Sequence, residues 1–216
     1  MNLLVTAGPT REFVDDVRYL SNLSSGRMGY AVAAAGAGAG HAVTLVSGPT
    51  DLASPPGVTR IDVETADEML AALQRLWPEA GALVMAAAVA DFKPARRLPG
   101  KLKKAGREAL TLELVPTPDI LGTLAPLKGK RIVVGFALET DGLLAEATRK
   151  MGAKSLDAVV ANSLENLGSD RATGTLIEAS GASETWTDLP KAEFGRRLVA
   201  LVERLSRPGA RAGAGP

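Results

Sequence analysis

Short apolar runs alternate with segments of helical periodicity along most of the chain. The apolar runs, which predict β-strands, lie at residues 3–6, 42–47, 59–63, 82–88, 131–137 and 158–161. The segments with helical spacing lie at residues 30–39, 66–77, 142–154 and 194–205, and Thr65 is the expected cap of the second. Such an alternation is typical of a parallel sheet whose faces are covered by helices.

Two further patterns predict small antiparallel elements. Apolar and polar residues alternate over residues 110–114, which predicts a strand with one solvent-facing side, as in half of a flap. Residues 176–177 and 185–187 flank a turn of small and polar residues and predict a hairpin. The whole pattern therefore predicts an α/β fold: a Rossmann-like, mostly parallel sheet with helices on both faces, plus a small β-hairpin or flap.

The length of the chain predicts one domain. A chain of 216 residues is long enough to bury a single hydrophobic core. Residues 207–216 contain only Gly, Ala, Pro and Arg, a composition that predicts a disordered tail. We therefore expect residues 1–206 to form the domain.

Charge and composition exclude several classes of function. Lys and Arg total 25 against 24 Asp and Glu, and this balance argues against a general nucleic-acid or membrane-surface binder. The absence of cysteine excludes disulfides, thiolate metal sites and a cysteine nucleophile. The chain starts directly on a strand and contains no apolar run long enough to span a bilayer, so we expect a cytoplasmic protein.

The segment 22–29, before the first predicted helix, is a candidate anion site. Ser24 or Ser25 can cap the helix, and Gly26 and Gly29 allow a close approach of the backbone to a ligand. Arg27 adds positive charge where the helix dipole is already positive. An ordinary capped helix with small residues packed on a sheet explains the same residues equally well.

Two groups of lysines are spaced so that they could serve one polyanion. Lys101, Lys103 and Lys104 form a dense patch, and Lys150 and Lys154 lie four apart on one helical face. If both groups face one pocket, they suit a nucleoside triphosphate. The simpler interpretation is a solvated charge cluster in the first case and compensation of the helix dipole in the second.

Isolated acidic and histidine residues carry less information. Asp91 and Asp119 are candidates for binding magnesium or ribose hydroxyls, and each is equally a candidate turn or helix cap. The sole histidine, His41, opens a predicted strand and is assigned a structural role. No phosphate-binding P-loop motif is present, and no G-x-G-x-x-G follows the first strand, which weakens a standard dinucleotide site.

Several motifs occur in a characteristic order. They are TAGPTRE (6–12), VRYLSN (17–22), SSG (24–26), MG (28–29), TLVSGP (44–49), AAVADF (87–92), KLKK (101–104), PDIL (118–121), GFALET (135–140) and AN (161–162). In this order they resemble the phosphopantothenate–cysteine ligase family, also called phosphopantothenoylcysteine synthetase. The resemblance extends over nearly the whole chain, up to about Leu205.

The resemblance implies a two-step reaction in coenzyme A biosynthesis. In that family the carboxylate of 4'-phosphopantothenate attacks the α-phosphate of a nucleotide, which releases pyrophosphate and forms an acyl-nucleotidylate. The amine of cysteine then displaces the nucleoside monophosphate. Bacterial members typically use CTP and eukaryotic ones ATP, so we expect CTP and leave ATP open. Mg²⁺ is expected to act mainly through the nucleotide phosphates, with no protein ligands assigned.

The resemblance also assigns residues to roles. Asn22 and Lys101 match family positions at the reaction centre, and we assign both to stabilising its charge. The residues expected to bind phosphopantothenate are Asn22, Ser24, Ser25, Gly26 and Arg27. The residues expected to bind the nucleotide are Met85, Ala86, Ala87, Asp91, Lys101, Pro118, Asp119, Ile120, Leu121, Phe136, Lys150 and Lys154.

Partners follow from the same resemblance. It implies a homodimer whose substrates are 4'-phosphopantothenate, cysteine and the nucleotide. Many bacterial members carry a flavin-dependent decarboxylase domain ahead of this one, and the sequence contains none, so we expect either a stand-alone ligase or an excised domain. A separate phosphopantothenoylcysteine decarboxylase is then the expected partner. Leu138 stands where alanine is common, and the match over residues 168–174 is loose.

Two other classes of function remain as alternatives. A nicotinamide-dependent reductase of the short-chain type shares the sheet class, but it needs a Tyr-x-x-x-Lys pair. Tyr19 is followed four positions later by Leu23, and Tyr30 by Ala34. The second alternative is a non-catalytic nucleotide-binding module, against which the presence of Asn22 and the lysine patch argues.

Overall fold

The computed structural model of the chain describes residues 1–104, 106, 108–138, 149, 151–162, 166 and 168–209. Residues 210–216 of the predicted tail, most of the helix predicted at 142–154 and Lys150 lie outside this part. Within it, none of the helices combines the length and the apolar character needed to cross a membrane.

Eight strands form the central sheet. Their bounds are β1 (Asn2–Ala7), β4 (Ala42–Ser47), β5 (Val58–Asp62), β6 (Ala82–Met85), β9 (Ile132–Leu138), β10 (Ala158–Asn162), β11 (Arg171–Glu178) and β12 (Ser183–Pro190). The order across the sheet is β12-β11-β10-β9-β6-β1-β4-β5. The strands from β5 to β10 are parallel, and β11 and β12 complete the sheet as an antiparallel pair. The predicted α/β fold and the predicted hairpin are both confirmed.

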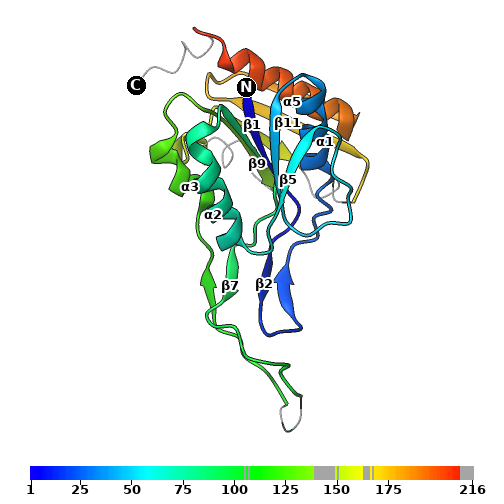
Figure 1. The fold of residues 1–216 in the computed structure, drawn as a ribbon, viewed down its shortest axis with the longest axis vertical. Helices are drawn as coiled ribbons and strands as arrows, with labels where there is room; N and C mark the ends of the chain where they lie inside the picture. Colours follow the sequence, from blue (N-terminus) through cyan, green and yellow to red (C-terminus); the bar gives the residue numbers. More distant parts are fainter. Residues whose placement is uncertain are drawn as a thin grey trace.

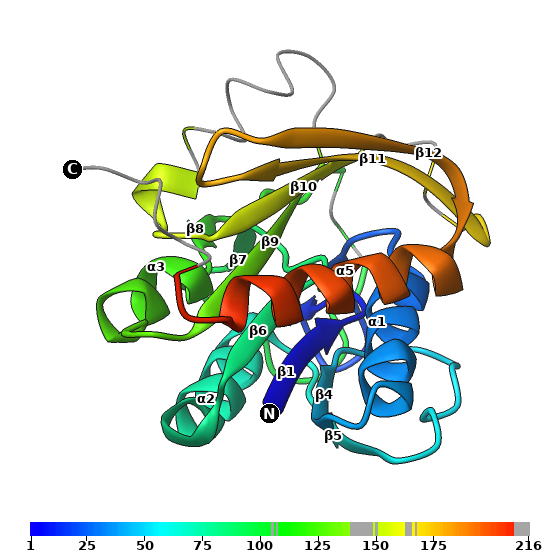
Figure 2. The ribbon, with the colours of Figure 1, turned by 90° about the horizontal axis from the view of Figure 1, so that it is seen from above.

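Helices cover both faces of the sheet, as Figure 2 shows from above. Helices α1 (Arg27–Gly38) and α5 (Lys191–Ser206) pack on one face, and α2 (Ala66–Leu76) and α3 (Ile120–Leu124) pack on the other. Each helix of the second pair continues into a short 3₁₀ turn, α2 into η1 (Trp77–Glu79) and α3 into η2 (Ala125–Leu127). Strand β1 illustrates why: Leu3 and Val5 belong to the first core, whereas Leu4 belongs to the second. Successive side chains of a strand point to opposite faces, so a strand buried on both sides is apolar throughout.

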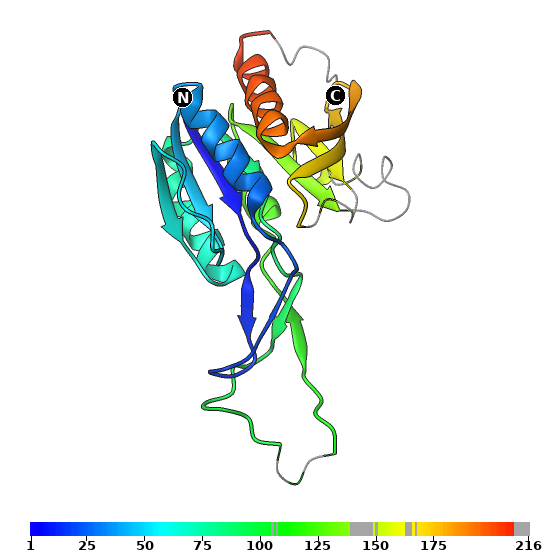
Figure 3. The ribbon, with the colours of Figure 1, turned by 90° about the vertical axis from the view of Figure 1, so that its right-hand side faces the viewer.

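An arm extends from the carboxyl edge of the sheet (Figures 1 and 3). It consists of the hairpin β2 (Arg11–Phe13) and β3 (Tyr19–Ser21), the pair β7 (Phe92–Pro94) and β8 (Leu114–Pro116), and the segment between β7 and β8. No strand was predicted between residues 7 and 24, so the β2–β3 hairpin was missed. The strand predicted at residues 110–114 was placed too early, because only Leu114 of that stretch is in β8.

Helix caps confirm two predictions and correct one. Thr65 caps α2 as predicted, since its side chain accepts from the Glu68 N–H (3.2 Å). Asp119, a candidate helix cap in the sequence, caps α3. The predicted serine cap of α1 is wrong: Gly26 is the cap residue, in a left-handed conformation (φ 77°), and no side chain caps the helix. Ser24 Oγ instead accepts from the Gly26 N–H (3.3 Å).

Helix α1 packs directly on β1 at Gly29. A Cβ atom on Gly29 would lie 2.5 Å from Ala7 Cβ and 2.6 Å from the Thr6 carbonyl oxygen.

We expect Gly29→Ala to lower the free energy of unfolding by about 1–3 kcal/mol, because the backbone of one element must move. The matched control is Gly38→Ala in the same helix, where the added Cβ meets nothing within 4 Å. That control should be neutral or stabilising in urea denaturation, and equal losses for both variants would contradict the packing explanation.

Candidate functional site

The order of the sheet strands reverses between β1 and β6. The chain proceeds from β1 outward to β4 and β5, then returns to β6 and continues to β9 and β10. Ligands of open parallel sheets bind at such a point, beyond the carboxyl ends of the strands. Here the loops that follow β1 and β6 are bonded together: the Ala88 N–H donates to the Gly8 carbonyl (2.9 Å) and the Thr10 N–H donates to the Ala88 carbonyl (3.3 Å). The two loops that flank this point are therefore joined by backbone hydrogen bonds.

Two fully buried threonines reinforce the junction. Thr6 Oγ1 accepts from the Ala87 N–H (3.1 Å), and Thr10 Oγ1 accepts from the Ala90 N–H (3.0 Å). Both hydroxyls thus fix the segment after β6. Neither threonine was among the candidate site residues. The sequence signal that could have identified Thr6 is a hydroxyl residue at the end of an apolar strand.

A cavity of about 350 Å³ lies beside this junction, at the ends of β6 and β9. Its lining is Met85, Ala87, Val89, Ala90, Asp91, Thr117, Pro118, Asp119, Ile120, Leu121, Phe136 and Lys154. Most residues predicted to bind the nucleotide are therefore brought to one place. Ala86 lies in the same segment without lining the cavity, and Lys150 lies outside the described residues. Val89, Ala90 and Thr117 were missed by the sequence analysis.

Thr117 fastens the two sides of the cavity to each other. Its hydroxyl donates to the Ala90 carbonyl (2.5 Å) and its N–H donates to the Asp91 carbonyl (2.9 Å). The segment after β6 is thus held at one end by the threonines of the β1 loop and at the other by the residue that precedes α3. Backbone groups fixed in this way form a preorganised wall.

Asp119 and Lys154 form the charged end of the cavity. Asp119 Oδ1 accepts from the Gly122 N–H (3.0 Å) and from Lys154 Nζ (2.9 Å). Burial opposes ionisation of the carboxyl, but these two donors outweigh it, so the pKa of Asp119 is lowered. Of the alternatives left open for Asp119, the cap is confirmed, because Asp119 caps α3. It also lines the cavity, and its role in binding magnesium or ribose stays a prediction.

The described residues do not form a magnesium site of their own. No group of three or more Asp, Glu or His side chains is placed to hold a metal ion in the described part of the chain. Asp119 is already engaged with Lys154, and Asp91 alone supplies one exposed carboxylate.

Asn22 lies at the junction next to the cavity. It follows β3, is exposed, and its Nδ2 donates to the Ala88 carbonyl (3.0 Å). Ala88 adjoins Ala87, which lines the cavity. The amide of Asn22 is thus held within one residue of the predicted nucleotide site, although the two segments lie more than 60 positions apart in sequence.

Lys101 lies in the arm and does not line this cavity. Its neighbour Leu102 is bonded to Arg18 at the far end of the hairpin. Arg18 lies at the turn end of the β2–β3 hairpin, whereas Asn22 follows the other end of β3. Lys101 and Lys154 line different cavities, and Lys150 lies outside the described residues. Within a single chain, Lys101 and Lys154 therefore do not meet the condition that both lysine groups face one pocket.

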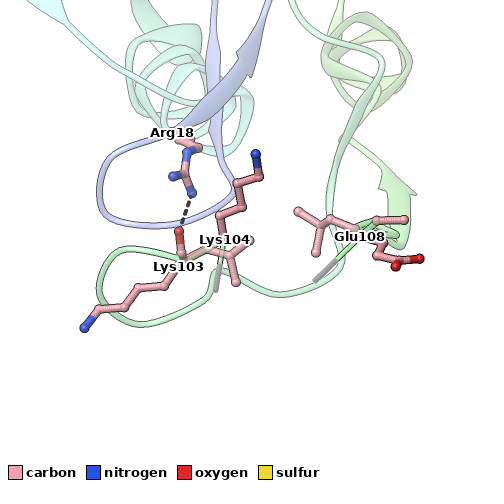
Figure 4. A pocket seen from close by; sticks show the side chains of 7 residues that line it. Arg18, Lys103, Lys104 and Glu108 are labelled. Carbon is pink, nitrogen blue, oxygen red and sulfur yellow. Dashed lines mark hydrogen bonds between the residues drawn. The ribbon is translucent and has the colours of Figure 1, made fainter. Parts of the chain in front are cut away.

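The lysines of the patch at 101–104 line two cavities within the arm itself. Lys101 lines a cavity of about 550 Å³ made entirely of arm residues. Lys103 and Lys104 line another of about 290 Å³ with Arg18 and Glu108, and Figure 4 shows these four side chains.

The helix mouth is built mainly by packing. A Cβ on Gly26 would lie 2.8 Å from Thr50 Cγ2, so this glycine is required by its neighbour as well as by its positive φ. Arg27 Nη1 donates to the Gly168 carbonyl and to Asp170 Oδ1, both at 2.8 Å. Ser24 and Ser25 are half-buried. The assignment of these residues to phosphopantothenate remains a prediction.

His41 lies at the opposite edge of the sheet from the cavity, at the start of β4. Its ring nitrogens lie 3.0 Å from Glu203 Oε1 and 3.5 Å from the amino terminus of Met1. This placement agrees with a structural role.

The sequence and the fold of the chain resemble those of known proteins. Residues 1–205 match the family described as the DNA/pantothenate metabolism flavoprotein C-terminal domain. Among curated proteins, the chain is 48% identical over 165 residues to the coenzyme A biosynthesis bifunctional protein CoaBC of Escherichia coli (strain K12), covering 75% of the chain and 41% of the relative. It is 36% identical over 211 residues to the CoaBC protein of Bacillus subtilis (strain 168), covering 95% and 52%.

A solved structure of the same kind of protein is also similar to the chain. The chain is similar to the crystal structure of the C-terminal domain of a CoaBC protein, with a TM-score of 0.81 and 36% identity over 94% of this chain and 93% of that one. The chain therefore spans about half the length of the curated relatives and nearly all of the solved C-terminal domain.

The Asp119–Lys154 pair predicts a pH-dependent stability. Because the pKa of Asp119 is lowered below 3.8 in the folded chain, its ionised form stabilises the fold above that pH. This contribution is lost as the pH falls through the folded-state pKa. We expect Asp119→Ala, which loses cap and ion pair, to cost about 1 kcal/mol at neutral pH. Asp119→Asn, which can still cap, should cost less.

Urea denaturation of both variants at pH 7 and at pH 3 checks this. The deficit of Asp119→Asn relative to the wild type should shrink at the lower pH. A deficit that grows on acidification would contradict the proposed charge pairing.

Proposed function

The chain belongs to the family of the DNA/pantothenate metabolism flavoprotein C-terminal domain, and from that premise we propose that it joins 4'-phosphopantothenate to cysteine in coenzyme A biosynthesis. The observation that carries the proposal is the cavity at the ends of β6 and β9, whose lining contains most residues expected to bind the nucleotide, Lys154 among them. The names of the E. coli and B. subtilis relatives support the same pathway. Because those relatives are bifunctional, we infer that the product passes to a phosphopantothenoylcysteine decarboxylase.

The proposed reaction proceeds in two displacements. A carboxylate oxygen of phosphopantothenate forms a bond to the α-phosphorus of CTP, or alternatively ATP, while the bond to pyrophosphate breaks. The cysteine nitrogen then bonds to the acyl carbon, the bond to the nucleoside monophosphate breaks, and the amine loses a proton. Both reactants of the first step are anionic, so their approach requires fixed positive charge and donors.

The cavity supplies part of this requirement. Lys154 provides a cation whose position is fixed by Asp119, 2.9 Å away. Such a fixed charge suits a triphosphate, because little reorganisation is needed when the ligand binds. Asn22 would place its side-chain amide at the carboxylate of phosphopantothenate, since its Nδ2 is held at the Ala88 carbonyl next to the cavity. Mg²⁺ would enter with the nucleotide.

We further propose that the protein is a homodimer formed through the arm. Five large apolar side chains of the arm are 43–58% exposed: Val17, Tyr19, Phe92, Leu110 and Leu114. A cluster of exposed apolar side chains on a projecting element is typical of an interface. Dimer formation could also bring Lys101 and Asn22 together, because the arm of one subunit could place its Lys101 at the reaction centre of the partner subunit.

The ligase activity is tested by pyrophosphate release from phosphopantothenate, cysteine and Mg²⁺, with CTP and ATP supplied separately. We expect pyrophosphate and the nucleoside monophosphate in equal amounts with at least one nucleotide. Lys154→Met should raise the KM for that nucleotide about 10- to 100-fold, as expected for loss of a charged contact. Lys130→Met, an exposed lysine that does not line the cavity, serves as the control. Absence of pyrophosphate with both nucleotides would contradict the proposal and favour a binding module.

A complementation experiment tests the shared reaction centre. Asn22→Asp and Lys101→Ala are each expected to retain only a small, measurable residual rate alone. If the two residues act from different subunits, mixed dimers contain one intact centre, and random subunit exchange should restore about a quarter of the wild-type rate. No recovery after verified exchange would show that both residues act within one subunit.

A further inference from the structure

The backbone on both sides of Lys101 is bonded to one turn of the β2–β3 hairpin. The Gly100 N–H donates to Asp16 Oδ2 (2.8 Å). The Leu102 N–H donates to Asp15 Oδ2 (3.0 Å). Lys101 itself is exposed. Two adjacent carboxylates thus hold the residues that flank a lysine whose own side chain faces solvent.

Asp15 is fully buried and accepts four hydrogen bonds. Its Oδ1 accepts from the N–H groups of Val17 (2.8 Å) and Arg18 (2.7 Å). Its Oδ2 accepts from Arg18 Nη1 (2.8 Å) as well as from Leu102. The pKa of Asp15 is lowered, chiefly by the Leu102 hydrogen bond and against the effect of burial. The carboxyl that fixes the hairpin turn therefore also holds the segment that carries Lys101.

Further contacts attach the same segment upstream of Lys101. Arg97 Nη2 donates to Asp16 Oδ1 (3.0 Å), and its guanidinium lies 4.7 Å from the centroid of the Phe13 ring. The Leu98 N–H donates to the Val14 carbonyl (2.9 Å). The segment 97–102 is thus attached to the hairpin at 97, 98, 100 and 102.

These attachments matter because the connection between β7 and β8 is long. It runs from residue 95 to residue 113, and a connection of that length without regular structure is free to sample many positions unless it is anchored. We propose that Asp15 and Asp16 are positioning residues, which clamp the backbone around Lys101 and so fix where its ammonium is presented to the acyl-phosphate chemistry. The inference rests on the proposed function only in assigning Lys101 to the reaction centre.

Asparagine variants test the clamp with little change in shape. In Asp16→Asn and Asp15→Asn, an amide NH₂ replaces one acceptor oxygen, so a donor faces a backbone or guanidinium donor. Asp16 is 52% exposed, so its variant is expected to fold even if the Asp15 variant does not. The control is Asp62→Asn, an exposed aspartate of β5 that also accepts from an arginine, Arg60.

The kinetic result should separate positioning from general damage. We expect kcat to fall about 10-fold for Asp16→Asn and up to about 100-fold for Asp15→Asn, with the KM for the nucleotide changed by less than about twofold. Combining Asp16→Asn with Lys101→Ala should cause no loss beyond that of Lys101→Ala alone. Losses that multiply in the double variant would overturn the proposal.

Limited trypsin digestion of the full chain provides a readout that does not depend on ligase activity. Under native conditions, cleavage after Lys101 and Lys103 should be about 10-fold faster in Asp16→Asn than in the wild type, because the segment opens more often. Asp62→Asn should match the wild type. Unchanged cleavage, or faster cleavage with unchanged kcat, would overturn the proposal. A wild-type chain without turnover would instead reject the proposed function, while the cleavage rates still report on the clamp.

Discussion

The junction between the loops after β1 and β6 is the constraint on which the rest of the site depends. In an open parallel sheet this point normally leaves a crevice for a ligand. Here the bridge between Pro9 and Ala88, supported by the hydroxyls of Thr6 and Thr10, joins the two loops on either side of this point. The cavity that Lys154 lines lies one strand further along, at β6 and β9. The two bonded loops then continue outward as the paired strands of the arm (Figure 3).

The lysines proposed to serve the reaction therefore lie in two separate parts of the chain, the cavity and the arm. One cation, Lys154, is fixed at the cavity by a carboxylate. The lysine patch at 101–104 is held at the far end of the arm, by carboxylates of the neighbouring hairpin. Fixed cations are more effective for charged transition states than mobile ones, because their reorganisation cost is already met by the fold. Among the described residues, Lys101 and Lys154 of one chain line different cavities, and this separation supports the proposed assembly.

The sequence predicted the sheet well because its signals are local. Strand β4 was predicted with the observed bounds, and Thr65 was correctly identified as the cap of α2, since apolar runs and capping residues act over a few positions. The β2–β3 hairpin was missed because three-residue strands are too short to show a period. The cap of α1 was missed because Gly26 owes its role to Thr50 and Gly8, neither of which is close in sequence. The separation of Lys101 from Lys154 depends on the arm's direction, which no local pattern encodes.

The most direct test of the cavity's role is a crystal structure of the protein with CTP and Mg²⁺. The account predicts nucleotide density in the cavity at the ends of β6 and β9, with the triphosphate against Lys154 and the segment after β6. Nucleotide density seated instead between β1 and β6, or only among the arm residues, would contradict it.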